Sequence, residues 1–260
     1  MDEFACPATG IQWRYAGCGA EGVLLLHGWA CPWWYWTRFT DRLDQRRFTF
    51  LIPDLPGFGA SEPPPSSWSF ESVARRLAVS LMELGVGECV TVGHSMGGSV
   101  ALHLAAALPR VAQRLVLFSS YPEPPAADVF SPVLESITEE GIPAALAGQL
   151  LSAWYPKSLP EERARLADGF SATPEVLRAS ALSITMGVAR EVRENVSVPT
   201  LIVLGAQDFT RPASSAQSFV QGRPERLLRI ISDTAHMVHW ENPGAAADSF
   251  ADFIGSEAGV

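Results

Sequence analysis

The chain has 260 residues, of which 47% are apolar and 18% are charged, and its 19 Lys and Arg against 28 Asp and Glu give a formal charge of −9. This apolar content excludes an intrinsically disordered chain, and the acidic balance argues against nucleic acid or an anionic membrane surface as the main partner, since each needs a basic footprint. At about 150 residues per domain, the length predicts between one and two domains.

Apolar runs of strand length alternate with helical patterns along most of the chain. The predicted strands cover residues 23–26, 48–53, 89–93, 114–118, 200–205 and 227–232. The predicted helices cover residues 34–44, 70–84, 96–108, 213–221 and 243–254. This alternation predicts an α/β fold with a parallel sheet covered by helices on both faces, and near-continuous apolar runs indicate strands that are buried on both faces.

One region interrupts this alternation. Residues 121–197 contain no clear strand but several amphipathic helical stretches, which Pro and Gly separate. A helical insertion between two strands of one sheet accounts for this pattern, and it is expected to cover the carboxyl edge of the sheet, where open α/β folds bind ligands. We therefore expect a core of residues 1–120 and 198–260, with residues 121–197 as a helical lid rather than a second folding unit.

The predicted strand 89–93 runs into the sequence GHSMGG at 93–98, and a helical pattern follows at once. The G-x-S-x-G spacing places Ser95 on a sharp strand-to-helix turn, because such a turn leaves no room for bulky neighbours. The turn is expected to expose the Ser95 hydroxyl beside free N–H groups of the new helix, which stabilise negative charge. An idle serine in a Gly-rich turn is the alternative, but the strand before it and the helix after it favour a nucleophile.

A serine hydroxyl needs a base that is itself oriented by a carboxylate. In this architecture the acid and then the histidine follow the serine along the chain. Asp208 and His236 each follow a predicted strand, so both are expected at the same sheet edge as Ser95. A helix cap is the alternative role of Asp208, and His239 is the rival base. We favour His236.

These residues predict acyl transfer. His236 takes the proton of Ser95 as the hydroxyl attacks a carbonyl, and Asp208 fixes the tautomer of the imidazole. The oxygen that becomes negative needs two donors. One is expected to be the backbone N–H of Met96, directly after the nucleophile, and the other is the backbone N–H of Trp29, in the loop after the first predicted strand.

With these motifs the chain resembles the α/β-hydrolase superfamily over essentially its whole length. His27-Gly28-Trp29 is similar to the family's HG oxyanion motif, residues 54–61 (DLPGFGAS) are similar to its D-x-P-G-x-G-x-S loop, and residues 236–243 are similar to its H-x4-E-x-P signature. The resemblance implies the α/β-hydrolase fold, with a mostly parallel central sheet flanked by helices and a helical lid inserted after the sixth strand. It also implies a serine esterase.

Several branches of the superfamily share these features. The HGW and DLPGFG motifs resemble those of pimeloyl-carrier-protein methyl esterases, whereas the lid length and the D-x-x-x-P at 208–212 resemble the enol-lactonase and general carboxylesterase branch. We expect a carboxylic ester hydrolase, with a lactonase or an acyl-carrier-protein methyl ester esterase as alternatives. An acidic carrier protein is disfavoured as a partner but not excluded, because residues 121–197 hold six basic and eleven acidic side chains, a net charge of −5.

Other descendants of the same fold have different activities. They include cofactor-free haloperoxidases, perhydrolases and oxygenases, and binding proteins that catalyse no reaction. Such proteins often lose the acid or change the serine turn. The presence of Ser95, Asp208 and His236 at their expected places argues against this class.

Aromatic residues indicate the kind of substrate. The run WWYW at 33–36 directly follows the predicted oxyanion loop, and its members cannot all face the core of the protein from one helix. The predicted substrate-binding residues are Trp29, Trp33, Trp34, Trp154 and Tyr155. They imply an apolar or aromatic group on the substrate, and contacts within the lid are the alternative for the last two. Arg211 is the one basic residue close in sequence to the triad, so the sequence does not demand a charged substrate.

The remaining expectations concern cofactors and cellular location. The cysteines show no CxxC spacing, so neither a zinc site nor a disulfide framework is indicated. The acidic start lacks the apolar run of a secretory signal peptide, and the most apolar stretch, 90–108, is too polar and glycine-rich to span a bilayer. We expect a cytoplasmic enzyme without cofactor or metal that acts on a small-molecule ester as a monomer or small homo-oligomer.

Overall fold

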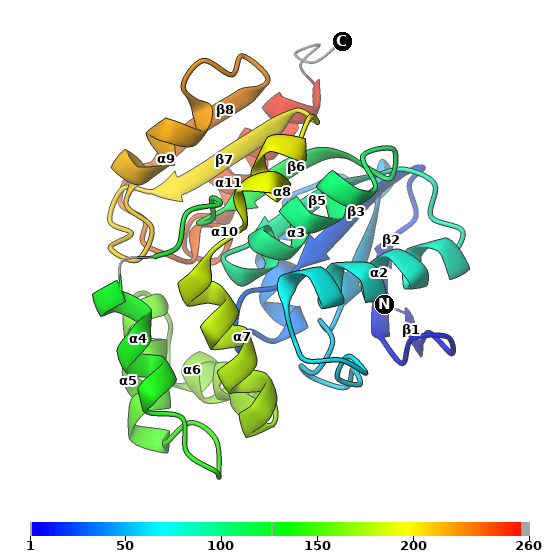
Figure 1. The fold of residues 1–260 in the computed structure, drawn as a ribbon. Helices are drawn as coiled ribbons and strands as arrows, with labels where there is room; N and C mark the ends of the chain where they lie inside the picture. The colour runs from blue at the N-terminus through cyan, green and yellow to red at the C-terminus, as the bar shows by residue number, and fades with distance from the viewer. Residues whose placement is uncertain (1, 126, 256–260) are drawn as a thin grey trace.

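The computed structural model describes residues 2–125 and 127–255, which form an eight-stranded sheet with the order β1-β2-β4-β3-β5-β6-β7-β8 (Figure 1). The strands are β1 (Asp2–Ala5), β2 (Gln12–Gly17), β3 (Glu21–Leu26), β4 (Phe48–Pro53), β5 (Cys89–His94), β6 (Ala112–Phe118), β7 (Thr200–Gly205) and β8 (Arg226–Ile231). Strands β3 to β8 are parallel, whereas β2 is antiparallel to both of its neighbours. The predicted mostly parallel sheet is confirmed.

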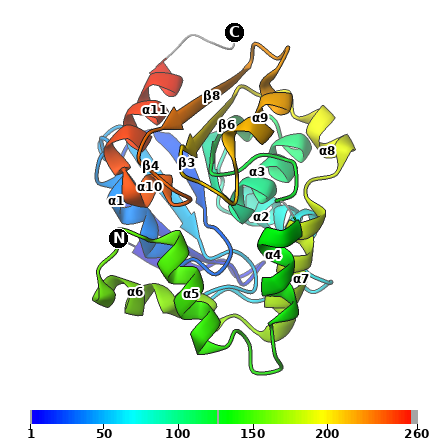
Figure 2. The ribbon, with the colours of Figure 1, turned by 90° about the vertical axis from the view of Figure 1, so that its left-hand side faces the viewer.

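Helices cover both faces of the sheet. In Figures 1 and 2, α2, α3, α8 and α9 lie on one face, and α1, α10 and α11 lie on the other. These helices are α1 (Thr37–Thr40), α2 (Phe70–Glu83), α3 (Met96–Ala107), α8 (Arg190–Asn195), α9 (Ala213–Val220), α10 (Val238–Glu241) and α11 (Pro243–Gly255). None of the helices in the described ranges has both the length and the apolar character that crossing a bilayer requires.

The apolar strand runs form the core between these layers. The side chains of residues 23–26 in β3 are fully buried, and all six residues of β7 are buried. Burying each leucine of this kind stabilises the fold by about 2 kcal/mol. Phe39 of α1 packs edge-on against Phe118 of β6 and Phe250 of α11, so aromatic contacts join the helices of one layer to the sheet.

The chain between β6 and β7 is helical, as the sequence predicts. It contains α4 (Ala127–Glu135), α5 (Ala144–Trp154), α6 (Pro160–Leu166), the 3-10 helix η2 (Ala167–Ser171), α7 (Pro174–Met186) and α8. Figure 2 shows α4 to α7 gathered at one end of the molecule, beyond the sheet. Helix α8 differs, because it returns to the sheet face and contacts α3.

Two local features differ from the sequence-based expectation. Strands β1 and β2 were not expected, because β1 is a mostly exposed edge strand and β2 is only partly buried, so neither has a continuous apolar run. The expected helix 34–44 is instead a 3-10 helix, η1 (Trp33–Trp36), followed by the four residues of α1. The Thr37 hydroxyl donates to the Trp34 carbonyl at 2.8 Å, and such local bonds compete with a regular helix.

Candidate active site

Ser95 lies on the turn between β5 and α3. Its backbone has φ 50° and ψ −115°, a strained conformation that costs a non-glycine residue about 1–3 kcal/mol. The flanking glycines allow the turn to close. A Cβ on Gly93 would lie 2.5 Å from the Gly97 carbonyl oxygen, and a Cβ on Gly97 would lie 2.1 Å from the Leu26 carbonyl oxygen. The strain is therefore located at the residue that the sequence predicts as the nucleophile.

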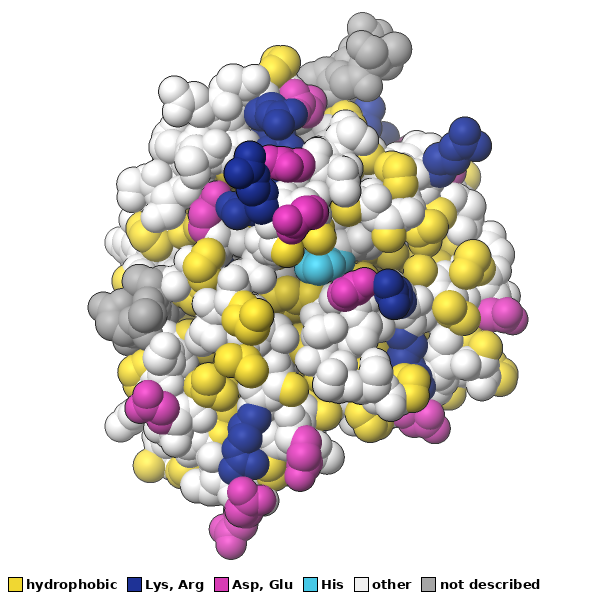
Figure 3. Space-filling model, in the orientation of Figure 1, with side chains coloured by type: hydrophobic (Ala, Val, Ile, Leu, Met, Phe, Trp, Pro, Cys, Tyr) yellow, Lys and Arg dark blue, Asp and Glu magenta, His cyan; other side chains and the backbone are white. Residues whose placement is uncertain are grey.

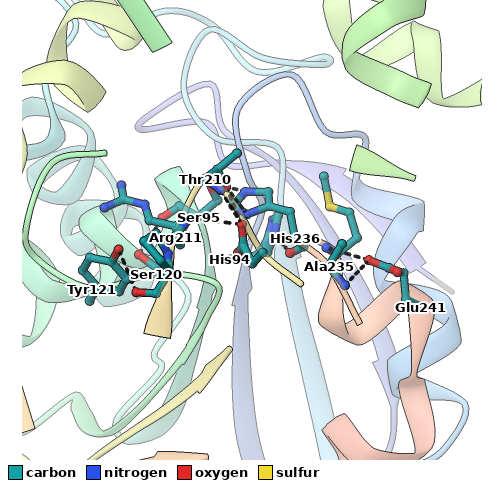
Figure 4. Close-up of polar contacts among 12 residues, drawn as sticks. His94, Ser95, Ser120, Tyr121, Thr210, Arg211, Ala235, His236 and Glu241 are labelled. Atoms are coloured by element: carbon teal, nitrogen blue, oxygen red, sulfur yellow. Dashed lines mark hydrogen bonds and ion pairs between the residues drawn. The ribbon is translucent and has the colours of Figure 1, made fainter. Parts of the chain in front are cut away.

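The residues of the predicted triad meet at the carboxyl edge of the sheet (Figure 4). Ser95 follows β5, Asp208 follows β7 and His236 follows β8. His236 Nε2 lies 3.1 Å from Ser95 Oγ, and His236 Nδ1 lies 2.8 Å from Asp208 Oδ2. Hydroxyl, imidazole and carboxylate thus form one hydrogen-bonded line, which is the geometry that general-base activation of a serine requires.

The turn after Asp208 holds its carboxylate. Asp208 Oδ1 accepts hydrogen bonds from the Thr210 N–H at 2.9 Å, the Thr210 hydroxyl at 2.7 Å and the Arg211 N–H at 3.0 Å. Burial raises the pKa of Asp208, but the charge of His236 and the hydrogen bonds outweigh it and lower this pKa to about 2. The carboxylate is therefore ionised at neutral pH and can orient the imidazole.

Thr210 is a part of this site that sequence reasoning missed. Its Oγ1 lies 2.8 Å from His236 Nδ1 while its hydroxyl donates to Asp208 Oδ1. One hydroxyl therefore contacts both the imidazole and the carboxylate. The available signal was a threonine two residues after the predicted acid, because Asp, Ser and Thr side chains often bond within such turns.

A buried carboxylate fixes the loop that carries His236. Glu241 of α10 accepts hydrogen bonds from the Ala235 N–H at 3.1 Å and from the Met237 N–H at 3.3 Å, on either side of the histidine (Figure 4). Burial raises the pKa of Glu241 above its usual value, although the two hydrogen bonds act in the opposite direction and lower this pKa. Glu241 belongs to the H-x4-E-x-P signature, and its position explains why a carboxylate is needed there.

His239, the rival base, lies in the aromatic core instead. Its ring centre is 4.4 Å from that of Trp36 and 4.5 Å from that of Tyr35. The side chain is fully buried, and neither ring nitrogen has a hydrogen-bond partner in the described part of the chain. Burial, with the charge of His236, lowers the pKa of His239 to about 3. The contact with Ser95 thus belongs to His236.

Replacing His239 with Phe is expected to make the fold more tolerant of acid. The unfolded histidine titrates near 6.5, whereas the folded one stays neutral down to about pH 3. Between these values the unfolded state binds the extra proton, so stability falls as the pH falls. The phenylalanine removes this loss, which amounts to about 2 kcal/mol at pH 5. Urea unfolding of the wild type and the variant at pH 7 and pH 5 measures this loss of stability. An equal decrease in the free energy of unfolding of the two proteins would contradict a neutral buried His239.

The residues that carry the two predicted oxyanion donors are next to Ser95 in the chain or line the same cavity. Met96 is the first residue of α3, and Trp29 lines the same cavity as Ser95. In residues 2–125 and 127–255, no protein group accepts a hydrogen bond from the backbone N–H of either residue. The neighbouring Gly28 N–H, by contrast, donates to the Tyr35 hydroxyl at 3.0 Å. Neither candidate amide is therefore occupied by a protein acceptor in the described structure.

The Trp29 side chain connects its loop to the helical segment between β6 and β7. Its Nε1 donates to Ser180 Oγ of α7 at 2.9 Å. Its ring packs edge-on against Phe130 of α4 and Trp154 of α5, with centroid distances of 5.2 and 6.2 Å. One tryptophan therefore ties the predicted oxyanion loop to three helices of that segment.

A cavity of about 80 Å³ lies beside Ser95 and His236. Its walls are mostly apolar and include Trp29, Phe130, Val133, Trp154, Ile184 and Met237. Of the predicted substrate-binding residues, Trp29 and Trp154 line this cavity. No group of three or more His, Cys, Asp or Glu side chains in the described residues is arranged to hold a metal ion.

The other three predicted substrate-binding residues lie outside this cavity. Trp33 packs against the Arg14 guanidinium, 4.6 Å from the ring centre. Trp34 and Tyr155 both pack against Trp240, with centroid distances of 5.6 and 5.8 Å. The expectation assumed a regular helix from residue 34, and the tighter turn of η1 directs its side chains elsewhere.

Comparisons with known proteins point to one family. Residues 23–249 match the sequence model of a family described as alpha/beta hydrolase. The chain is 28% identical over 244 residues to the biotin biosynthesis bifunctional protein BioHC of Cellvibrio japonicus, covering 89% of this chain and 47% of that protein, so it spans about half of that relative. It is 25% identical over 260 residues to the pimeloyl-acyl-carrier-protein methyl ester esterase of Vibrio vulnificus, covering 95% of this chain and 99% of that one. The enol-lactonase of Burkholderia xenovorans has the same fold, with a TM-score of 0.86 at 22% identity over 98% of this chain and 100% of that one.

Proposed function

This chain belongs to the alpha/beta hydrolase family and is a hydrolase, and from that premise we propose that it cleaves a carboxylic ester with a small-to-medium apolar or aromatic group. The observation that carries the proposal is the hydrogen-bonded line from Ser95 Oγ through His236 to Asp208, which borders a largely apolar cavity. In this proposal Ser95 is the nucleophile, His236 the base and Asp208 the residue that orients the base.

The reaction has two halves. In the first, His236 Nε2 takes the hydroxyl proton as Ser95 Oγ attacks the ester carbonyl, and the N–H groups of Met96 and Trp29 stabilise the oxyanion. The tetrahedral intermediate collapses, and the alcohol leaves with the proton from His236. In the second half, water loses a proton to the same nitrogen and attacks the acyl-enzyme, which releases the acid and restores the Ser95 hydroxyl.

We further propose that the helical segment 121–197 acts as a lid over a core of residues 1–120 and 198–260. Helices α4, α5 and α7 contribute Phe130, Trp154 and Ile184 to the cavity wall. A wall of this kind excludes water and selects the acyl or alcohol group by its size.

A panel of p-nitrophenyl esters tests the proposed function. We expect hydrolysis of the acetate and butyrate and much slower hydrolysis of the octanoate, because a cavity of about 80 Å³ has room only for a short chain. A fluorophosphonate probe is expected to label Ser95, as shown by peptide mass mapping. Failure of both hydrolysis and labelling would exclude a serine esterase and leave a non-catalytic or oxygen-dependent role on this fold.

An acyl-carrier-protein methyl ester esterase is the second candidate, since a relative carries that name over 95% of this chain. Charge counts against it, because residues 121–197 have a net charge of −5 and carrier proteins are acidic. Figure 3 shows acidic side chains beside basic ones on this face, with no uninterrupted basic surface. Faster cleavage of a carrier-bound methyl ester than of the free methyl ester would favour this candidate.

A further inference from the structure

Arg211 is a buried cation in the wall of the cavity beside Ser95. The residue is 4% exposed, and it lines the cavity together with Ser95 and His236. A buried charge is unfavourable unless an opposite charge and hydrogen bonds compensate for it. The groups around this guanidinium therefore indicate what the cavity is suited to bind.

The partners of the Arg211 guanidinium are neutral. Its Nη1 donates to the backbone carbonyl of Glu123, and its central carbon lies 5.0 Å from the centre of the Tyr121 ring. Figure 4 shows Arg211 and Tyr121 together on one side of Ser95, with Glu241 on the other. Among the residues that the structure describes, no carboxylate oxygen lies within 4.0 Å of this guanidinium.

The two acidic residues whose charges act on Arg211 are engaged elsewhere. Asp208 accepts a hydrogen bond from the Arg211 backbone, and its other oxygen lies 2.8 Å from His236. Glu123 Oε1 lies 3.3 Å from Arg193 Nη1. The cavity thus has a mostly apolar lining and one positive group in its wall that forms no ion pair within the described residues.

We infer that Arg211 binds a carboxylate of the substrate, so that the preferred substrates are short esters whose apolar acyl chain ends in a carboxylate. A planar guanidinium pairs with a carboxylate through two parallel hydrogen bonds, and the chain between the two groups must be short because Arg211 and Ser95 line the same small cavity. Arg211 is then a specificity-determining residue. This inference rests on the proposed function, because it requires that Ser95 attacks an ester in the same cavity.

Two substrates of matched size test this assignment. Monomethyl glutarate carries a terminal carboxylate, and methyl 4-carbamoylbutanoate has a neutral amide in its place. Hydrolysis is followed by proton release in a pH-stat at pH 7.5. We expect kcat/KM for the carboxylate to exceed that for the amide by about 30-fold, because a hydrogen-bonded charge pair replaces a neutral contact. The R211Q variant is expected to lower this ratio to about one, and R211K to leave an intermediate ratio because it keeps the charge without the planar fork.

The test compares kcat/KM for two substrates of the same variant, so a general loss of activity in that variant does not change the ratio. Arg226→Gln is the matched control, because Arg226 is also buried and also donates to backbone carbonyls, those of Phe219 and Val196, outside the cavity. Its ratio is expected to equal that of the wild type. A wild-type ratio near one, or a high ratio that R211Q retains, would overturn the role of Arg211. If fluorophosphonate still labels Ser95 in the same sample, either of these results contradicts the role of Arg211 alone and leaves the proposed function intact. If Ser95 is not labelled, both the role of Arg211 and the proposed function are contradicted.

Discussion

Ser95→Ala is expected to lower kcat for p-nitrophenyl acetate by about 10⁵-fold, because no acyl-enzyme can form without the hydroxyl. The remaining groups stay in place, since Ser95 Oγ contacts only His236 Nε2 in the described structure. The variant is therefore expected to bind substrate and to unfold at nearly the same urea concentration as the wild type. Stopped-flow or steady-state release of p-nitrophenol measures kcat directly.

Ser99→Ala provides the control for Ser95→Ala. Ser99 is a buried serine one turn further along α3, and the proposed mechanism gives it no role. Its kcat is expected to stay within about twofold of the wild-type value, as for most substitutions away from the reacting atoms. If the Ser95 variant kept a tenth of the wild-type kcat, or if the two variants lost equal activity, another nucleophile would have to be sought.

His236→Ala is expected to have the second largest effect, a loss of about 10⁴-fold in kcat. The substitution removes the base and leaves the Ser95 hydroxyl protonated and weakly nucleophilic. Activity above the uncatalysed rate is expected to remain, because the substitution leaves the proposed oxyanion donors, the N–H groups of Met96 and Trp29, in place. Rates of the variant are compared with hydrolysis in buffer alone.

His239→Phe distinguishes between the two histidines of this loop. His239 packs among Trp36, Tyr35 and Phe118 rather than on Ser95, so a phenyl ring is expected to fit there and to keep kcat within about tenfold of the wild type. A loss as large as that of His236→Ala would reverse the assignment of the base. Equal urea midpoints at pH 7 would show that folding is not the cause.

The sequence predicts those parts of the fold that leave a continuous pattern. The buried strands have uninterrupted apolar runs, and residues 48–53 and 200–205 were predicted with the bounds that the structure shows. Strand β1 leaves no such pattern, because it is mostly exposed and periodicity reports burial against the core. Helix η1 has buried residues, Tyr35 and Trp36, but its four residues are too few for a period to distinguish it from an α-helix.

The residues of the candidate site also differ in whether the sequence could predict them. Ser95, Asp208 and His236 could be named because each must follow a strand that ends at one edge, and the topology brings them to within hydrogen-bond distance. Thr210 left a signal in its spacing from Asp208, whereas the proposed role of Arg211 depends on the groups around its side chain, which no spacing in the chain encodes. The cavity walls were harder still to predict. Trp33 and Trp34 lie in a 3-10 helix instead of the expected α-helix, and they contact Arg14 and Trp240 rather than the cavity.

The bond between Trp29 and Ser180 links the proposed oxyanion loop to helix α7. The amide expected to stabilise the oxyanion belongs to the same residue whose indole is anchored on α7. The position of this amide therefore depends on the position of α7 through the indole of Trp29. Under the proposed mechanism, substitutions that loosen α7 are therefore expected to weaken oxyanion stabilisation as well, and so to lower kcat.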